Sequence, residues 1–211
     1  MATETFLRLP EEKRERFVES AWEEFLRVPF EEASINKIVL KARIPRGSFY
    51  QYFGDKKELF YDLAGTMLRH LLGEYSKILR RYNGDMFRTQ IHCFDMVMEG
   101  GHTDVHFNRG IALLQRNPVF LAQQIVENRV AYYIWDTVKE DVDVTMFRNE
   151  DEELARQTLV MSLVMLVMTM TDAMARPEEA ETCRRVLLTR MDILKHGSLK
   201  ETCREGESRD E

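Results

Sequence analysis

Residues 34–57 gather side chains that can bind a polyanion and contact the edges of bases. Six cations lie there against the single carboxylate of Asp55: Lys37, Lys41, Arg43, Arg46, Lys56 and Lys57. Arginine can pair with the O6 and N7 atoms of guanine and glutamine with adenine, while lysine binds phosphate. Arg46 and Gln51 are therefore candidates for base contacts. The local charge of +5 contrasts with a net charge of −6, which taken alone argues against nucleic acid.

Two short helices joined by a tight turn are expected to position these side chains. Ser34 is a suitable N-cap for the first helix, whose apolar positions, such as Ile38, share one face. Pro45 forces a new start, so a second short helix covers residues 45–52 after a turn at residues 42–44. This spacing is typical of a helix-turn-helix motif.

Longer helices are expected on both sides of this motif. The preceding helix is amphipathic and should end before Pro29. Asp55 and Glu58 have the spacing of an N-cap and a capping box, so they open a long helix that Asn83 and Gly84 end. The sequence therefore predicts a three-helix head followed by a connecting helix.

These residues resemble the DNA-binding domain of the tetracycline-repressor (TetR) family of bacterial transcriptional regulators. The family pattern runs from Thr/Ser-Ile-x-x-Ile through Gly-Ser/Thr-hydrophobic-Tyr-x-Tyr/His-Phe to Lys-x-x-Leu. This sequence supplies Ser34, Ile35, Ile38, Gly47, Ser48, Phe49, Tyr50, Tyr52, Phe53, Lys56 and Leu59. It departs at Arg43, where the family usually has glycine, and at Pro45, where Ser or Thr is common. A left-handed conformation at Arg43 would cost about 1 kcal/mol.

The resemblance implies DNA contacts from both short helices. Gly47 and Ser48 would let the second helix approach the DNA closely. From its chemistry, Arg46 can contact guanine or hold a phosphate, and Gln51 can contact adenine. Positions that resemble the family's backbone-contacting residues are Ser34, Lys37, Tyr50, Tyr52 and Lys56. The alternative is that the two tyrosines belong to the aromatic core of the head and that the lysines form a solvated face.

Five more helices are expected, over residues 85–99, 103–116, 118–140, 150–176 and 178–196. Residues 154–174 are apolar nearly all round, so a helix there must bury two faces. With the last helix, it resembles the pair that forms a four-helix dimer interface in the family. The expected interface residues are Met161, Met165, Met168, Leu187 and Met191. The alternative is a central helix in a monomeric core.

The resemblance also implies a pocket for a small-molecule effector among these helices. Aromatic, methionine and polar residues are its candidate lining: Phe94, Met98, Phe107, Asn108, Phe120, Tyr132 and Trp135. Their composition favours an effector that is hydrophobic or aromatic. The alternative is a plain core position for the aromatic residues and a solvated position for Asn108.

The sequence offers little sign of catalysis, metal binding or a membrane segment. The sequence has no Gly-rich phosphate loop, HExxH motif or GxSxG motif, so an enzyme is not expected. His92, His102 and His106 have a spacing that can bind a metal, but surface histidines are commoner, so neither a metal nor a cofactor is expected. Three widely spaced cysteines, no signal peptide and no apolar run long enough to span a bilayer predict a cytoplasmic protein without a membrane partner.

Together these patterns predict an all-α protein with an N-terminal helix-turn-helix head and a C-terminal helical bundle. The head covers residues 1–54, helix 55–82 is a linker, residues 55–197 bind effector and dimerise, and residues 198–211 form a disordered tail. The expected function is ligand-responsive transcriptional regulation, as a repressor that binds a near-palindromic operator in double-stranded DNA as a homodimer and that a small hydrophobic effector releases. The alternative is a small-molecule binding protein with an inactive DNA-binding head.

Overall fold

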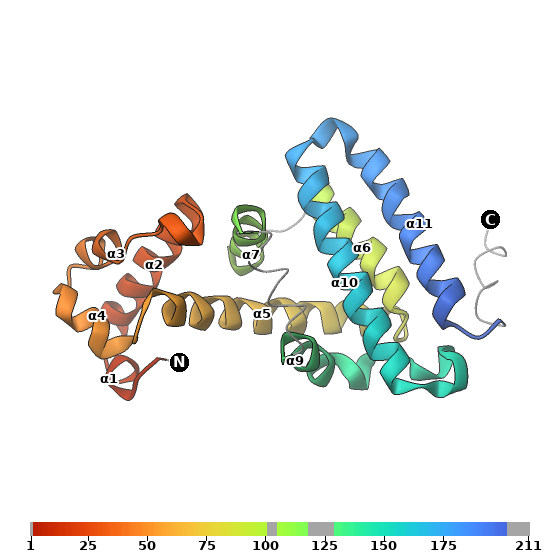
Figure 1. The fold of residues 1–211 in the computed structure, drawn as a ribbon, viewed down its shortest axis with the longest axis horizontal. Helices are drawn as coiled ribbons and strands as arrows, with labels where there is room; N and C mark the ends of the chain where they lie inside the picture. The colour runs from red at the N-terminus through yellow and green to blue at the C-terminus, as the bar shows by residue number, and fades with distance from the viewer. Residues whose placement is uncertain (1, 101–104, 118–128, 202–211) are drawn as a thin grey trace. The chain divides into compact units, whose positions relative to one another are not determined.

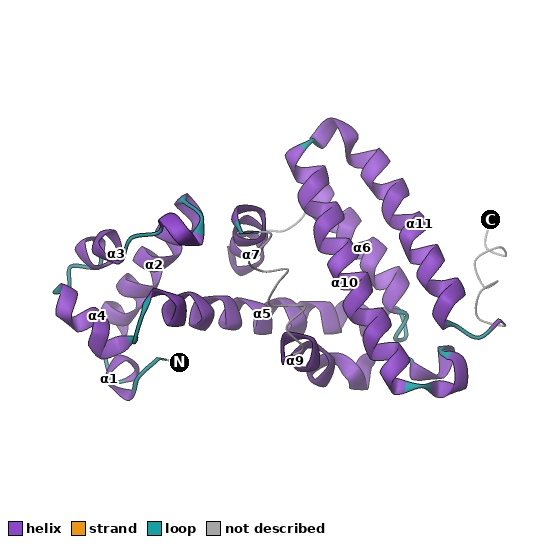
Figure 2. Cartoon of the chain, in the orientation of Figure 1, coloured by secondary structure: helices purple, strands orange, loops and turns teal. Residues whose placement is uncertain are grey.

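A computed structural model describes residues 2–100, 105–117 and 129–201, and every regular element in these ranges is a helix (Figures 1 and 2). The all-α prediction is confirmed. The chain forms two compact units, Met1–Leu71 with Asp104–Asn117, and Leu72–Thr103 with Pro118–Glu211. The expected division at residues 54 and 55 concerns which part binds DNA and which binds effector, and it stays a prediction.

The first unit contains the two short helices and those around them. Its elements are α1 (Glu4–Leu7), α2 (Glu11–Arg27), η1 (Phe30–Glu32), α3 (Ile35–Lys41), α4 (Arg46–Tyr52), the first part of α5 (Lys56–Arg81) and α7 (Val105–Arg116). Helices α2 to α5 begin and end close to the residues that the sequence predicts. Helix α1 is an addition that the sequence pattern did not predict.

Helix α1 closes one side of an aromatic core. Thr3 caps the helix, because its Oγ1 accepts a hydrogen bond from Phe6 N at 3.3 Å. The buried Phe6 ring packs on Phe17 and Phe53, with centroids 5.5 and 5.0 Å away. One apolar residue in a four-residue helix is too short a pattern to detect from periodicity.

Inward-facing rings from α2, α4 and α5 complete this core. Phe17 stacks on Phe53 at 5.9 Å between centroids, and Phe25 meets Phe60 edge-on at 5.1 Å. Phe49 is also fully buried. The four-residue spacing of Phe49 and Phe53 puts both on the same side, and their burial determines which side of α4 stays outside.

Residues 42–45 form the turn between α3 and α4. Arg43 has a φ of 55°, the left-handed conformation that glycine adopts without strain. The turn is closed by hydrogen bonds from Arg43 N to Leu40 O at 3.2 Å and from Ile44 N to Val39 O at 3.0 Å. The turn therefore forms with arginine at the left-handed position.

The second unit is built mainly from long helices. Its elements are the rest of α5, α6 (Met86–Met98), α9 (Arg129–Val138), η2 (Lys139–Asp141), η3 (Val144–Met146), η4 (Arg148–Glu150), α10 (Glu152–Ala175), η5 (Pro177–Glu179) and α11 (Ala180–Ser198). Helices α6, α10 and α11 lie side by side (Figure 1). Asp85 and Asp151 cap α6 and α10, each accepting two backbone hydrogen bonds. Residues 118–128 of the expected helix 118–140 lie outside the described residues.

The connection between α5 and α6 depends on a glycine. Gly84 has a φ of 84°, and a Cβ atom there would lie 2.4 Å from Asp143 N. Gly84 N donates to Leu79 O at 2.9 Å, and Asp143 N donates to Gly84 O at 3.2 Å. The break that the sequence predicts here is thus a tight turn against another segment of the chain.

The first residues of the expected tail are part of the fold, which corrects the prediction for them. Ser198 ends α11, and Leu199 is fully buried and forms an antiparallel bridge with Phe147. Lys200 N donates to Met146 O at 3.0 Å. A single leucine in a polar segment carries no periodic signal, so the sequence could not reveal this anchor. Residues 202–211 lie outside the described residues.

Helix α10 is long and apolar enough to cross a membrane by length and composition alone. Core helices of soluble proteins meet the same criterion, and α10 packs against α6, α9 and α11. Its Leu159 and Leu166 are buried, whereas Met161 and Met168 are exposed. The apolar surface of α10 therefore has one covered side and one uncovered side.

Candidate nucleic-acid interface

Helix α4 turns one face toward solvent. Arg46, Gly47, Tyr50 and Gln51 are exposed, and their four-residue spacings place them in two adjacent rows, which we call the α4 face. Tyr50 is 50% exposed, a large fraction for an aromatic side chain. Ser48 is half-buried beside them. Guanidinium, amide and phenol groups on one small helix face can donate to both bases and phosphates.

Packing within the protein does not require glycine at position 47. A Cβ atom there would have no neighbouring heavy atom within 4 Å. Alanine would also favour the helix by about 0.5–1 kcal/mol. The exposed backbone at Gly47 therefore suits the close approach of another molecule.

The neighbouring helix α3 orients Arg46. The Nη1 atom of Arg46 donates a hydrogen bond to Oδ1 of Asn36, on α3, at 2.7 Å. Lys37, next to Asn36, is also exposed. A side chain that is already held loses less rotamer entropy when it meets a partner. Helices α3 and α4 thus contribute to one polar cluster.

The start of α3 is capped from α2. Ser34 occupies the N-cap position that the sequence predicts, but its side chain makes no capping bond. Glu24, only 5% exposed, accepts a hydrogen bond from Ser34 N at 2.9 Å and two from Arg27 at 2.8 and 2.9 Å. The bonds from Arg27 are the main cause that lowers the pKa of Glu24, and they outweigh the opposing effect of burial. A carboxylate from another helix therefore fixes the position of α3.

Lys56 holds the loop before α3. Its Nζ donates to the carbonyl oxygens of Phe30, Glu31 and Ala33 at 2.7, 3.0 and 2.9 Å, and it lies 4.7 Å from the centre of the Phe30 ring. An ammonium group has three protons, so these bonds use all of its donors. The donors of Lys56 are thus engaged inside the fold, and its expected phosphate contact stays a prediction.

Helix α7 holds the same loop from another side. Asn117 Oδ1, just after α7, accepts a hydrogen bond from Phe30 N at 2.8 Å. Arg109 pairs with Glu19 on α2 and lies 5.7 Å from the centre of the Trp22 ring. The loop before α3 is therefore tied to α5 and α7 together.

Tyr52 belongs to the core of the head. It is 3% exposed, and its ring lies 5.7 and 5.9 Å from the rings of Phe6 and Phe17. Each residue turns a helix by about 100°, so Tyr50 and Tyr52, two positions apart, point to nearly opposite sides. The expected DNA contact of Tyr52 is corrected to a core position, while Tyr50 stays on the α4 face.

Residues 17–63, from α2 into α5, match the model of the family described as bacterial regulatory proteins, tetR family. This segment of the chain thus carries the DNA-binding domain of the TetR family. This confirms the family that the sequence motifs resemble. The matched model is that of a family of bacterial regulatory proteins.

Solved structures include proteins that are similar to this chain. SmeT, the repressor of the Stenotrophomonas maltophilia multidrug efflux pump SmeDEF, matches with a TM-score of 0.54 and 17% identity over 92% of this chain and 95% of its own. A TetR-family transcriptional regulator from Chloroflexus aurantiacus is 25% identical over 95% of this chain and 100% of its own, with a TM-score of 0.48. The similarity to SmeT concerns the fold alone. No curated protein matches the chain in sequence.

The candidate effector-binding residues are divided between the two units of the chain. Phe107 and Asn108 lie on α7 in the first unit, and Phe94, Met98, Tyr132 and Trp135 lie in the second. Phe94 and Trp135 are buried, and Tyr132 is 51% exposed with the Arg156 guanidinium 4.1 Å from its ring centre. Phe120 lies outside the described residues. Neither unit by itself brings the candidates together.

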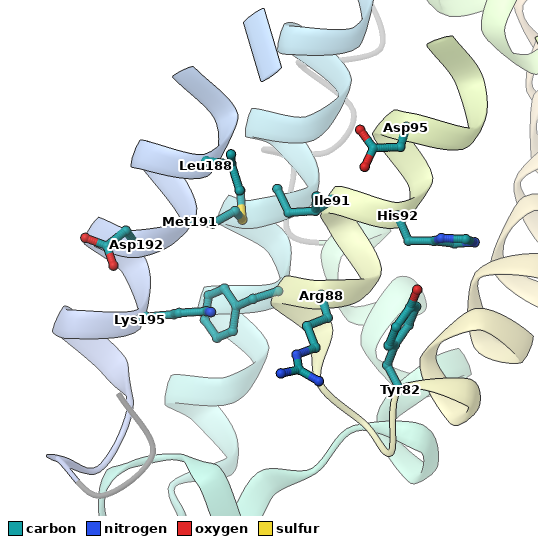
Figure 3. Close-up of a pocket in the computed structure, with 10 residues that line it drawn as sticks. Tyr82, Arg88, Ile91, His92, Asp95, Leu188, Met191, Asp192 and Lys195 are labelled. Atoms are coloured by element: carbon teal, nitrogen blue, oxygen red, sulfur yellow. The ribbon is translucent and has the colours of Figure 1, made fainter. Parts of the chain in front are cut away.

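A groove between α6 and α11 in the second unit has a volume of about 300 Å³ (Figure 3). Its lining combines the aromatic ring of Tyr82 with Arg88, Lys195, Asp95 and other side chains, and none of the effector candidates is among them. Arg184 donates two hydrogen bonds to Asp95 at 2.6 and 2.9 Å. The mixed charge of the groove favours no particular class of ligand.

The dimer candidates differ in exposure. On α10, Met161 and Met168 are 48% and 59% exposed and Met165 is half-buried, as a contact surface requires. On α11, Leu187 and Met191 are 0% and 3% exposed, which corrects them to the core of the second unit. The apolar residues that α11 turns outward are Val186, Leu188 and Ile193. Both sides of α11 are apolar, so the sequence did not reveal which side is covered.

The histidine cluster stays untested. His102 and the side chain of His106 lie outside the described residues, and His92 packs edge-on against Tyr82 at 5.5 Å between centroids. Within the described ranges, no group of three His, Cys, Asp or Glu residues could hold a metal. The expected lack of a metal or cofactor stays a prediction.

Proposed function

We propose that this chain recognises a specific DNA sequence by placing the α4 face in the major groove. Arg46 and Gln51 contact base edges, while Ser48 and Tyr50 bind the DNA backbone. Ser34 and Lys37 add backbone contacts from α3. The observation that carries this proposal is the open space at Gly47, because only a partner outside the fold gains from glycine there.

The regulator acts as a homodimer. Five exposed apolar side chains on α10 and α11 support this: Met161, Met168, Val186, Leu188 and Ile193. Uncovered apolar residues on neighbouring helices favour association because burial removes them from water. A two-fold dimer presents two α4 helices, which fits a near-palindromic operator.

Regulation follows from an effector that changes the affinity for DNA. A small hydrophobic molecule releases a repressor from its operator if it binds more tightly to the form with low DNA affinity. Repression and location in the cytoplasm are proposed from the family. The alternative, a binding protein with an inactive head, was suggested by Arg43, but the turn forms with Arg43 in place.

Selection of bound duplexes from a random DNA library tests the proposal. At near-physiological salt, the wild-type protein should enrich a near-palindromic site, and Arg46→Ala with Gln51→Ala should abolish this enrichment. The control Arg88→Ala removes one exposed cation from the second unit and should leave the selected site unchanged. A folded wild-type dimer that enriches no site, with or without effector candidates present, would favour the binding-protein alternative.

A further inference from the structure

One cation of the α4 face is held by a side chain of the neighbouring helix. Arg46, the first residue of α4, donates from its Nη1 to Oδ1 of Asn36, the second residue of α3, at 2.7 Å. Both side chains are exposed, so the bond between them adds little to the stability of the fold. Its main consequence is therefore the direction that it gives to the Arg46 guanidinium.

The bond orients Arg46 without neutralising it, because the amide of Asn36 carries no charge. Lys41, on α3, is instead paired with the carboxylate of Glu23 on α2. The ammonium group of Lys56 donates to three carbonyl groups inside the fold. Arg46 thus combines a held direction with a full positive charge at the surface.

The bond to Asn36 also leaves one edge of the guanidinium complete. A guanidinium has five N–H donors in a planar fork. Nη1 gives one of them to Asn36, while Nε and Nη2 keep theirs and can donate two parallel bonds. The O6 and N7 atoms of guanine accept such a pair in the major groove. Arg46 can therefore bind one guanine while it stays bonded to Asn36.

The helix that carries Asn36 is itself fixed in place. Ser34, the N-cap of α3, donates from its backbone N to the buried Glu24 of α2 at 2.9 Å. On the other side, the backbone at Gly47, next to Arg46, is open to a partner. A side chain that a rigid element already holds is preorganised for binding. The plane of the Arg46 guanidinium is thus set before DNA arrives.

We infer that Asn36 is a positioning residue that turns Arg46 toward a guanine and so sets the base specificity at one position of the operator. This inference rests on the proposed function and deepens it, because it names the base that Arg46 contacts and the residue that directs the contact. Recognition of a base depends on the orientation of the donor pair, whereas a phosphate contact changes the affinity for all sequences alike.

Binding of operator duplexes with each of the four base pairs at one position tests this inference. The position is the one at which Arg46→Ala relaxes the site obtained by the library selection. The wild-type protein should prefer guanine there by roughly 5- to 150-fold, and Asn36→Ala should reduce this preference by roughly two- to tenfold. In the Arg46→Ala background, Asn36→Ala should change the preference no further, because Asn36 acts through Arg46.

Two matched variants separate the orientation of Arg46 from the charge near DNA. Asn36→Asp keeps an acceptor oxygen, so it should keep the guanine preference while its negative charge weakens binding to all four duplexes. Lys37→Ala changes the exposed neighbour of Asn36, and it should weaken binding to all four duplexes alike. Asn36→Ala should unfold at the wild-type temperature, since its side chain is exposed.

Several results would overturn the inference and leave the proposed function standing. These are a selected site without a guanine that depends on Arg46, a guanine preference that Asn36→Ala leaves intact, and a preference that Asn36→Asp also loses. A further loss in the double variant, or a clearly lower unfolding temperature of Asn36→Ala, would do the same. A folded wild type that selects no site would overturn the proposed function and the inference together.

Discussion

Arg43 controls how much strain the turn of the helix-turn-helix motif carries. Its left-handed backbone is unfavourable for any residue with a Cβ atom. Arg43→Gly should therefore raise the free energy of unfolding by about 1 kcal/mol in urea titrations. Arg43→Ala removes the same charge but keeps the Cβ atom, so it serves as the control. Equal stabilities of the two variants would contradict a strained turn.

Lys56 should behave as a structural lysine and its neighbour Lys57 as a surface lysine. Lys57 is exposed, with its Nζ 5.4 Å from the Tyr61 ring centre. Lys56→Met should lower the free energy of unfolding by about 2 kcal/mol, because three hydrogen bonds to a charged group are lost, whereas Lys57→Met should change it little.

The salt dependence of DNA binding separates this role from a phosphate contact. Losing one phosphate contact reduces the slope of log K against log salt by about 0.9. Lys56→Met should bind DNA more weakly, because the loop before α3 is displaced when Lys56 no longer holds it. The slope should nevertheless equal that of the wild type. A reduced slope together with unchanged stability would instead indicate that Lys56 contacts a DNA phosphate.

The sequence predicted the residue types of the interface better than their directions. Arg46, Tyr50 and Gln51 are exposed as the motif requires. Tyr52 is in the same motif but is buried, and the partners of Lys56 are carbonyl groups that no side-chain pattern reveals.

At the scale of elements, the connection between α5 and α6 tolerates no side chain at Gly84. Gly84→Ala should lower the free energy of unfolding by at least about 2 kcal/mol, because a Cβ atom would meet the backbone of Asp143 in a left-handed conformation. Gly73, on α5, has open space around it, so Gly73→Ala should raise stability by about 0.5–1 kcal/mol. Calorimetric unfolding of both variants checks this opposite effect.

The cap that α2 provides for α3 should depend on pH. The pKa of Glu24 is lowered in the folded state, so its contribution to stability is complete above the ordinary carboxyl pKa of 4.5 and is lost as the pH falls through the lowered value. Glu24→Gln should be less stable than the wild type at pH 7, and the difference should shrink below about pH 4.5. The control Glu15→Gln changes an exposed carboxylate of the same helix. A difference that is constant with pH would contradict the charged cap.

Most elements follow from local signals, and the exceptions have local causes. Periodicity, prolines and glycines predicted helices α2 to α7, α10 and α11 close to their observed bounds. Helix α1 and the anchor at Leu199 depend on contacts with distant residues, which leave no pattern in a short segment. The covered side of α11 is likewise decided by packing on α6 and α10.

At the scale of the whole molecule, the exposed apolar residues of α10 and α11 should hold a dimer together. Met168→Glu with Ile193→Glu places two charges on side chains that are 59% and 65% exposed, so the fold should persist while the dimer dissociates. Sedimentation velocity should show a dimer weakened at least about tenfold. The control Leu7→Glu changes a residue of α1 that is 58% exposed and should stay dimeric. A double variant as dimeric as the wild type would point to another interface.

The residue at position 47 should also indicate whether a descendant of this chain has kept DNA binding. Nothing inside the fold needs a glycine there, and alanine would make a better helix, so drift under selection for stability alone should replace it. Descendants of this chain that still bind an operator should keep position 47 as glycine. Lineages that have given up DNA binding should lose this glycine early, while the buried Phe49 beside it, which the core needs in either case, remains.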